Sequence, residues 1–256
     1  MVFDLTGKVI LVTGASKGIG AAIVRALGAQ GAHIVAHYGG DADGAGKAVA
    51  HLPPERVHLV QGDFHDNRQV DCLWEAAVGW RGRIDVLINN AAIMRWTGGL
   101  DADDASWDAV WAETLQVNVL ATARLSRSAV RHFRIQGGGI IITVSSWAAQ
   151  RGVTNPDTAT YAASKAAIKA FTQTIARGYA KDNILAYVIA PGVVRTQMSE
   201  NFAATQGGEE AVTRGLTMGE WVPPEDVAAV AAFLASGASR HLTGATLDVN
   251  GASYVR

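Results

Sequence analysis

Short apolar runs alternate with longer helical patterns along the whole chain, and this alternation most limits the fold that it can adopt. Runs such as Val9–Val12 and Ile140–Val144 are almost continuously apolar, which is typical of parallel strands covered on both faces. The pattern predicts an α/β fold, a Rossmann-type doubly wound parallel β-sheet with helices on both faces and right-handed crossovers. Further strands are expected at 34–36, 57–60, 85–89, 184–189 and 246–249, and helices at 19–30, 67–80, 105–135, 158–180 and 223–234.

Length and composition are those of a globular protein with one large domain. The chain has 256 residues, of which 49% are hydrophobic and 18% charged, and it contains no evident linker or repeat. We therefore expect a single domain over residues 1–256. The net charge of −1 gives no reason to expect nucleic acid or an anionic membrane as a partner. No apolar stretch approaches the roughly 20 residues of a membrane span.

The N-terminus and the cysteine bear on the cellular compartment. Met1–Lys8 contains two charged residues and no apolar run, so we do not expect a signal peptide. Cys72 is the single cysteine and rules out an intramolecular disulfide. It lies in an expected helix, where a small core residue is the simplest interpretation. A free thiol fits a reducing cytosol, so we expect a cytoplasmic protein.

The seven histidines raise the question of a metal site. His33 and His37 are four residues apart, but they lie in a strand-like segment rather than on one helix face. The chain contains no His-Glu-x-x-His and no Cys-x-x-Cys. We therefore expect no metal.

A glycine-rich turn, Thr13–Gly20, follows the first strand directly and opens the first helix. Its glycines permit a tight turn, close approach of the backbone to a pyrophosphate, and close packing of helix on strand. The helix N-terminus would offer free amides to the phosphates. The spacing Gly-x-x-x-Gly-x-Gly departs from the usual fingerprint, and a generic turn is the alternative, but the strand-turn-helix context favours dinucleotide binding. The expected contacts are Gly14, Ser16, Lys17, Gly18, Ile19 and Gly20.

The end of the second strand bears on which dinucleotide is bound. NAD sites typically place an acid there, whereas this chain has His37, Tyr38, Gly39 and Gly40, with no acid before Asp41. Lys17 could meet a 2′-phosphate by charge-assisted hydrogen bonds, although a solvated turn lysine is the alternative. We favour NADP(H) as the cofactor, with NAD(H) as the alternative, and expect Tyr38 and Gly39 to contact it.

Tyr161 and Lys165 are four residues apart on an expected helix and therefore share one face. A lysine ammonium beside a phenol favours the phenolate and lowers the tyrosine pKa toward neutrality. A tyrosine adjusted in this way can act as a general acid or base. The spacing alone also arises by chance, so its weight depends on the rest of the chain.

The least patterned segment is Arg195–Trp221, after the sixth expected strand. A loop this long inside a compact domain is usually functional or mobile. It would lie at the carboxyl side of the sheet, where ligands bind in open α/β folds. We expect residues 195–222 to form a substrate lid, with a surface insertion as the alternative.

Several motifs occur together in a fixed order: Thr13–Gly20, Asp63, Asn89–Ala92, Asn118, Ser146, Tyr161-x-x-x-Lys165, and Pro191-Gly192 followed by Thr196. In this combination the chain resembles the short-chain dehydrogenase/reductases over essentially its whole length. The resemblance implies that Tyr161 is the catalytic acid/base and that Lys165 binds the nicotinamide ribose and lowers the tyrosine pKa. Ser146 would hydrogen-bond the substrate oxygen, and Asn118 would support a water-linked proton relay to the lysine.

The resemblance also implies further cofactor contacts. They are Asp63 and Phe64 at the adenine, Asn90, Ala91 and Ala92 along the adenosine ribose, and Pro191, Gly192, Val194 and Thr196 on the nicotinamide side. Ala92 stands where the family usually has glycine, and its methyl group could crowd the ribose. The interval between the Ser145-Ser146 pair and Tyr161 is slightly longer than usual, which leaves Ser145 as an alternative to Ser146.

Aromatic and methionine side chains near the expected active site favour a carbonyl substrate with apolar bulk. Arg95, Arg151 and Arg195 lie near the same edge, and each could receive a substrate carboxylate; surface charge is the alternative. The candidate wall residues, for which core packing is the alternative, are Met94, Trp96, Trp147, Val153, Met198 and Trp221.

We therefore predict an NAD(P)-dependent oxidoreductase that transfers hydride between the nicotinamide and a carbonyl or secondary alcohol, with NADPH-dependent ketone reduction favoured. The alternative is an NAD-dependent dehydrogenase of a sugar, polyol or other secondary alcohol; a non-catalytic dinucleotide-binding regulator is more remote. An enoyl reductase would need a longer tyrosine-to-lysine spacing. The resemblance also implies a homotetramer formed through the long helices and the C-terminal strand region.

Overall fold

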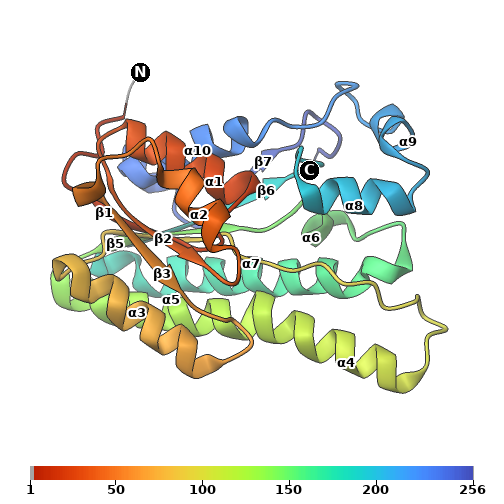
Figure 1. Cartoon of the computed structure of the whole chain (residues 1–256), viewed down its shortest axis with the longest axis horizontal. Coiled ribbons are helices and arrows are strands. Elements are labelled where there is room, and N and C mark those ends of the chain that lie inside the picture. Colours follow the sequence, from red (N-terminus) through yellow and green to blue (C-terminus); the bar gives the residue numbers. More distant parts are fainter. Residues whose placement is uncertain (1–2, 256) are drawn as a thin grey trace.

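The computed structural model describes residues 3–255, and the expected domain limits at 1 and 256 lie outside them. Seven parallel strands form one sheet in the order β3-β2-β1-β4-β5-β6-β7, with helices on both faces (Figure 1). The expected fold class is therefore confirmed. The strands are β1 (Val9–Val12), β2 (His33–Tyr38), β3 (Val57–Gln61), β4 (Val86–Asn89), β5 (Gly139–Val144), β6 (Ile184–Pro191) and β7 (Thr246–Val249).

Two hydrophobic cores separate the sheet from its two helix layers. In β5, Ile140, Ile142 and Val144 enter one core, whereas Ile141 enters the other, because successive side chains of a strand point to opposite faces. On one face lie α1 (Gly18–Ala29), α2 (Ala42–Val49) and α10 (Pro224–Ser236); on the other lie α3 (Asn67–Arg81), α4 (Asp104–Leu115), α5 (Thr122–Gln136) and α7 (Ala159–Tyr179) (Figure 1). Burial on both faces explains why the strands read as unbroken apolar runs.

The order of strands reverses at β1, and this reversal positions the ligand site. From β1 the chain moves outward through β2 and β3, and it then returns to place β4 on the other side of β1. Ligands of doubly wound folds bind at the carboxyl ends of the strands beside such a reversal. The turns after β1 and β4 therefore face a common crevice.

The segment Arg195–Trp221 differs from the expectation of an unpatterned loop. It contains α8 (Gln197–Thr205) and α9 (Glu209–Arg214), each too short for a hydrophobic period to stand out in the sequence. Helix α2 was missed for the same reason. The other short elements are α6 (Ala148–Arg151) and single 3-10 turns at Pro54–Arg56, Pro156–Thr158, Ala180–Asp182 and Arg240–Leu242.

Two smaller expectations also need correction. Cys72 is exposed rather than a core residue, because α3 buries the face that carries Val70, Leu73 and Ala77. The long helix expected at 105–135 is interrupted by a π-helical turn, Gln116–Ala121, between α4 and α5. Within residues 3–255, no helix is both long and apolar enough to cross a bilayer.

Candidate active site

The ends of β1 and β4 are joined by a compact set of hydrogen bonds. The buried Thr13 hydroxyl accepts from the backbone N–H groups of Asn90 and Ala91, both at 3.0 Å. In return, the Asn90 amide donates to the carbonyls of Thr13 and Gly14 at 2.9 and 3.1 Å. The segment after β4 is thereby held against the glycine turn. Thr13 carries much of this contact, although the sequence suggested for it no role beyond opening the turn.

The glycines of the turn leave no room for side chains. Gly14 has a φ of +66°, and a Cβ there would lie 2.9 Å from the Cα of Ala91. A Cβ at Gly20 would lie 2.0 Å from the carbonyl oxygen of Gly14, because α1 starts directly against the turn. Helix α1 begins without a side-chain cap and without an acidic residue in its first turn. Its N-terminus is therefore suited to an anionic group such as the pyrophosphate of a dinucleotide.

His37 lies between this turn and the end of β3, a direction that the sequence left open. Its Nδ1 accepts the N–H of Gly14 at 3.2 Å, so its Nε2 carries the hydrogen that is donated to the carbonyl of Gly62 at 2.9 Å. The ring stacks on Phe64 with centroids 4.7 Å apart. Burial lowers the pKa of His37 to about 4, so the imidazole is neutral at physiological pH.

A cavity of about 370 Å³ follows the crevice from the glycine turn to the catalytic candidates. Asp63 and Phe64 line an adjoining cavity of about 580 Å³ together with His37. Tyr38 lines neither cavity, and Gly20 packs behind the turn. The first cavity brings together most of the expected cofactor contacts: Gly14, Ser16, Lys17, Gly18, Ile19, Gly39, Asn90, Ala91, Ala92, Tyr161, Lys165, Pro191, Gly192, Val194 and Thr196.

Tyr161, in the first turn of α7, and Ser146, after β5, meet where this cavity joins a second one. The two side chains lie close together, and the Ser146 hydroxyl acts to lower the pKa of Tyr161. The hydroxyl of the neighbouring Ser145 instead donates to the backbone carbonyl of Lys165 at 2.9 Å and is buried. The geometry thus directs Ser146, and not Ser145, toward Tyr161. An oxygen atom bound at this junction could accept hydrogen bonds from both hydroxyls.

Lys165 lies one turn beyond Tyr161, with its Nζ 5.7 Å from the centroid of the tyrosine ring. The ammonium donates to the carbonyl of Val144 at 2.8 Å. Burial lowers the pKa of Lys165 to about 8 and raises that of Tyr161 to about 12, outweighing the opposite effect of the nearby Ser146 hydroxyl. The pKa of Tyr161 is therefore raised by burial rather than lowered toward neutrality as expected. Desolvation disfavours both charged forms, and the lysine is engaged with a backbone carbonyl.

Asn118 is buried in the π-helical turn and does not line either cavity. Its Oδ1 accepts the N–H of Ile93 at 2.8 Å, and its Nδ2 donates to the Ile93 carbonyl at 2.9 Å and to the Ser164 hydroxyl at 3.0 Å. One side chain thus ties the segment after β4 to α7, the helix of Tyr161 and Lys165. π-Helical turns inside α-helices often mark functional sites.

The second cavity also measures about 370 Å³, and its wall mixes apolar with polar side chains. Of the expected substrate residues, Met94, Trp147, Val153 and Met198 line it beside Ser146 and Tyr161. Trp96 is absent from the lining, and Trp221 is buried behind it, donating from Nε1 to the Thr213 hydroxyl. Helices α8 and α9 and the turn that follows add residues that the sequence did not suggest: Phe202, Gln206, Ala211, Val212, Gly215 and Leu216.

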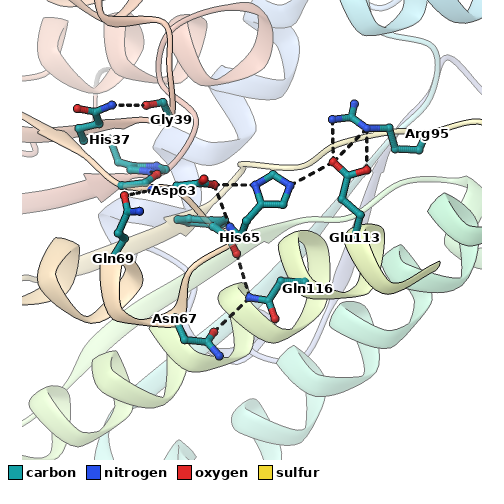
Figure 2. Close-up of polar contacts among 12 residues, drawn as sticks. His37, Gly39, Asp63, His65, Asn67, Gln69, Arg95, Glu113 and Gln116 are labelled. Carbon is teal, nitrogen blue, oxygen red and sulfur yellow. Dashed lines mark hydrogen bonds and ion pairs between the residues drawn. The ribbon is translucent and has the colours of Figure 1, made fainter. Parts of the chain in front are cut away.

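An ion-pair network borders the adjoining cavity and was not expected from the sequence. Figure 2 shows His65 between the carboxylates of Asp63 and Glu113, with contacts of 2.6 and 3.1 Å, and Arg95 on the other side of Glu113 at 3.0 Å. Hydrogen bonds from His65 lower the pKa of Asp63, and the two carboxylates raise that of His65. The network joins the loop after β3 to α4 and to the segment after β4. Within residues 3–255, no cluster of three or more metal-ligating side chains occurs.

Known proteins that are similar to this chain match it over nearly its whole length. A family model described as Enoyl-(Acyl carrier protein) reductase matches residues 14–252. The 3beta-hydroxysteroid dehydrogenase 1 of Eggerthella lenta is 37% identical over 251 residues, which cover 97% of this chain and 94% of that protein. The 3-oxoacyl-[acyl-carrier-protein] reductase of Synechocystis sp. is 35% identical over 250 residues, covering 96% and 97%.

A solved structure matches the whole architecture. It is a short chain dehydrogenase from Burkholderia cenocepacia in complex with NADP, with a TM-score of 0.86 and 32% identity. The match covers 97% of this chain and 98% of that one. The likeness therefore extends over the sheet, both helix layers and the crevice.

Proposed function

The chain belongs to the short-chain dehydrogenase/reductase family and is an oxidoreductase of CH–OH or C=O groups; from that premise we propose that it is an NADPH-dependent reductase of ketones. The meeting of Ser146 and Tyr161 at the junction of two cavities carries the proposal. One cavity suits a dinucleotide and the other a carbonyl compound, so the reacting atoms would meet beside the two hydroxyls.

In the proposed mechanism, Tyr161 is the general acid. The nicotinamide supplies the hydride when the cofactor is bound. Because burial raises the pKa of Tyr161 to about 12, the phenol retains its proton at neutral pH and can donate a hydrogen bond to a carbonyl oxygen. Ser146 donates a second hydrogen bond to the same oxygen. Both bonds strengthen as negative charge develops on that oxygen, and Tyr161 then transfers its proton to it.

Lys165 would assist this proton transfer as a cation below the phenol. A charged ammonium beside the phenolate stabilises the form of Tyr161 that has lost its proton. The Val144 carbonyl holds the ammonium at this depth, and Asn118 fixes the helix that carries both residues. We assign to Asn118 the role of positioning this helix. We assign to Lys165 the binding of the nicotinamide ribose hydroxyls.

The charges of the cofactor cavity favour NADP(H) over NAD(H). Lys17 is exposed in its lining and makes no ion pair among the residues 3–255. Asp41 lines the same cavity, but its carboxylate accepts the N–H of Gly44 at 2.8 Å and caps α2. A 2′-phosphate could therefore pair with the unpaired Lys17, while the Asp41 carboxylate is hydrogen-bonded to the start of α2. Tighter binding of NADH than of NADPH in fluorescence titration would favour the secondary-alcohol dehydrogenase instead.

Substitution of Tyr161 tests the proposed reaction. Tyr161→Phe keeps the ring and removes the acidic hydroxyl, so kcat should fall about 10²- to 10⁴-fold on a ketone panel. NADPH affinity should change little, because the glycine turn and the β4 segment remain intact. Tyr254→Phe, at the C-terminal end, serves as a control that keeps activity. A Tyr161→Phe enzyme with wild-type turnover would refute the assignment.

We propose that residues 195–222 act as the substrate lid. Helices α8 and α9 contribute Met198, Phe202 and Val212 to the wall of the substrate cavity. The base of the segment is closed by a parallel bridge between Val194 and Val222. Opening would then move the two helices while the base stays attached to the sheet. Faster proteolysis of this segment without ligand than with NADPH and ketone would support a moving lid.

We also propose a cytoplasmic homotetramer. The π-helical turn exposes Leu120, which is 54% accessible, on the outer layer of α4 and α5. Burying such a surface between copies would be favourable. An exposed thiol at Cys72 fits a reducing compartment. Sedimentation that gives a monomer at micromolar concentration would contradict the tetramer, and cell fractionation tests the location.

A further inference from the structure

Three arginines near the carboxyl edge of the sheet were candidates for an anionic substrate group, and two of them are already neutralised. Arg95 forms a two-pronged ion pair with Glu113, with contacts of 3.0 to 3.2 Å. Arg195 pairs with Glu209 at 2.9 Å and lies over the ring of Trp221. Neither guanidinium is available without breaking a charge pair.

Arg151 differs from both. It is the last residue of α6, and among residues 3–255 no carboxylate lies within ion-pair distance of it. Its guanidinium carbon lies 4.6 Å from the centroid of the Trp147 ring. Stacking uses the flat face of a guanidinium and leaves the N–H groups at its edge free to donate. The aromatic ring thus holds a cation in place without satisfying its hydrogen-bonding capacity.

The position of Arg151 allows its side chain to contact a ligand in the substrate cavity. It lines the substrate cavity together with Trp147, which directly follows Ser146. It is the single charged residue of that lining, and no acidic residue balances it. The remaining wall is uncharged and mixes apolar side chains such as Met94, Met198 and Leu216 with polar ones. A cavity with one cation at its side and no acidic residue is complementary to a molecule that carries one negative charge.

We propose that the substrate of this enzyme is a keto acid, whose carboxylate is bound by Arg151 while its ketone oxygen lies between Ser146 and Tyr161. The inference rests on the proposed reductase function and adds the class of substrate. In the reaction, hydride from the reduced nicotinamide forms the new C–H bond at the ketone carbon, and Tyr161 delivers the proton to its oxygen. The product is a hydroxy acid with an unchanged carboxylate, and the cofactor leaves oxidised.

The test compares keto acids with their methyl esters, which match them in shape and lack the charge. Suitable pairs are benzoylformate and methyl benzoylformate, and 5-oxohexanoate and its methyl ester, with NADPH as cofactor. For the wild type we expect a higher kcat/KM for the acid in at least one pair. Because a hydrogen-bonded ion pair contributes a substantial part of binding, Arg151→Leu should lower the acid-to-ester ratio about 10- to 100-fold. Arg151→Lys should restore part of it.

Arg131→Leu is the matched control. Arg131 is exposed on α5 and lies near Gly137 and Asn183, at the amino ends of β5 and β6, away from the carboxyl ends where the active site lies. Its substitution should leave the acid-to-ester ratio unchanged. A wild type that prefers the ester in every pair, or an Arg151→Leu enzyme with the wild-type ratio, would overturn the inference while the reductase function stands. Failure to reduce any ketone, acid or ester, would instead refute the proposed function itself.

Discussion

Protonation of the buried His37 should destabilise the fold, and this gives a test of how the glycine turn is held. The ring is 2% exposed, and both of its nitrogens are used in the neutral form. Protonation would add a hydrogen to Nδ1, which could then no longer accept the Gly14 N–H. Two donors would face each other at this contact. We expect the free energy of unfolding to fall as the pH is lowered, and substitution of His37 to reduce that dependence.

The magnitude follows from the two pKa values. The pKa of His37 is about 4 in the folded state and 6.5 for an ordinary histidine, so the unfolded state binds the proton more tightly. The contribution to stability is therefore complete above pH 6.5 and is lost as the pH falls toward 4. At about 1.36 kcal/mol per pH unit, the loss reaches roughly 3.4 kcal/mol below pH 4 and about 2 kcal/mol at pH 5.

Urea denaturation at pH 8 and pH 5 provides the assay. His37→Asn retains an acceptor for the Gly14 N–H and cannot take up the proton, so its stability should fall about 2 kcal/mol less than that of the wild type over this range. Burial also lowers the pKa values of His33 and His132, but both residues remain in each protein and cancel in the comparison. His51→Asn, at an exposed position after α2, should behave as the wild type. Equal losses in the wild type and His37→Asn would refute the reasoning.

Two further predictions concern the cofactor crevice. Gly20→Ala should weaken NADPH binding about tenfold or more in a fluorescence titration, because its Cβ would lie 2.0 Å from the Gly14 carbonyl oxygen and displace the turn. Gly46→Ala in α2, where nothing lies within 4 Å, should keep wild-type affinity; the same affinity in both variants would argue against a rigid turn. In an NMR titration, the pKa of His65 should lie above 6.5, and Glu113→Gln should lower it by removing one of the two carboxylates that raise it. A pKa that does not respond to this change would show that the His65–Glu113 contact is not maintained in solution.

The fold could be predicted from the sequence because its signals are local. Continuous apolar strands such as Val9–Val12 and Ile140–Val144 require cover on both faces, and their alternation with helical patterns leads to a parallel doubly wound sheet. The glycine turn was recognisable from its place between a strand and a helix. Short elements without a full hydrophobic period, including α2, α8 and α9, gave no such signal.

The chemistry of the site depended on contacts between residues far apart in the chain. Ser145 and Ser146 are indistinguishable by spacing, and only the packing of β5 against α7 turns one hydroxyl to a backbone carbonyl and the other to Tyr161. The direction of the Tyr161 pKa shift could not be predicted from the sequence. The four-residue spacing indicates that Lys165 lies near Tyr161, but it does not show how deeply the two side chains are buried, and burial raises the tyrosine pKa.

The sequence by itself determined the alternation of strands with the longer helices, the glycine turn between the first strand and the first helix, and the candidate catalytic side chains, because each is a pattern within a few consecutive residues. Tertiary structure alone decided which way the ring of His37 points, which arginine remains unpaired beside the substrate cavity, and which helices enclose that cavity. Arg95 and Arg195 looked equivalent to Arg151 until folding brought Glu113 and Glu209 to the first two. Charge pairing and burial are properties of neighbours in space, and local sequence patterns do not encode them.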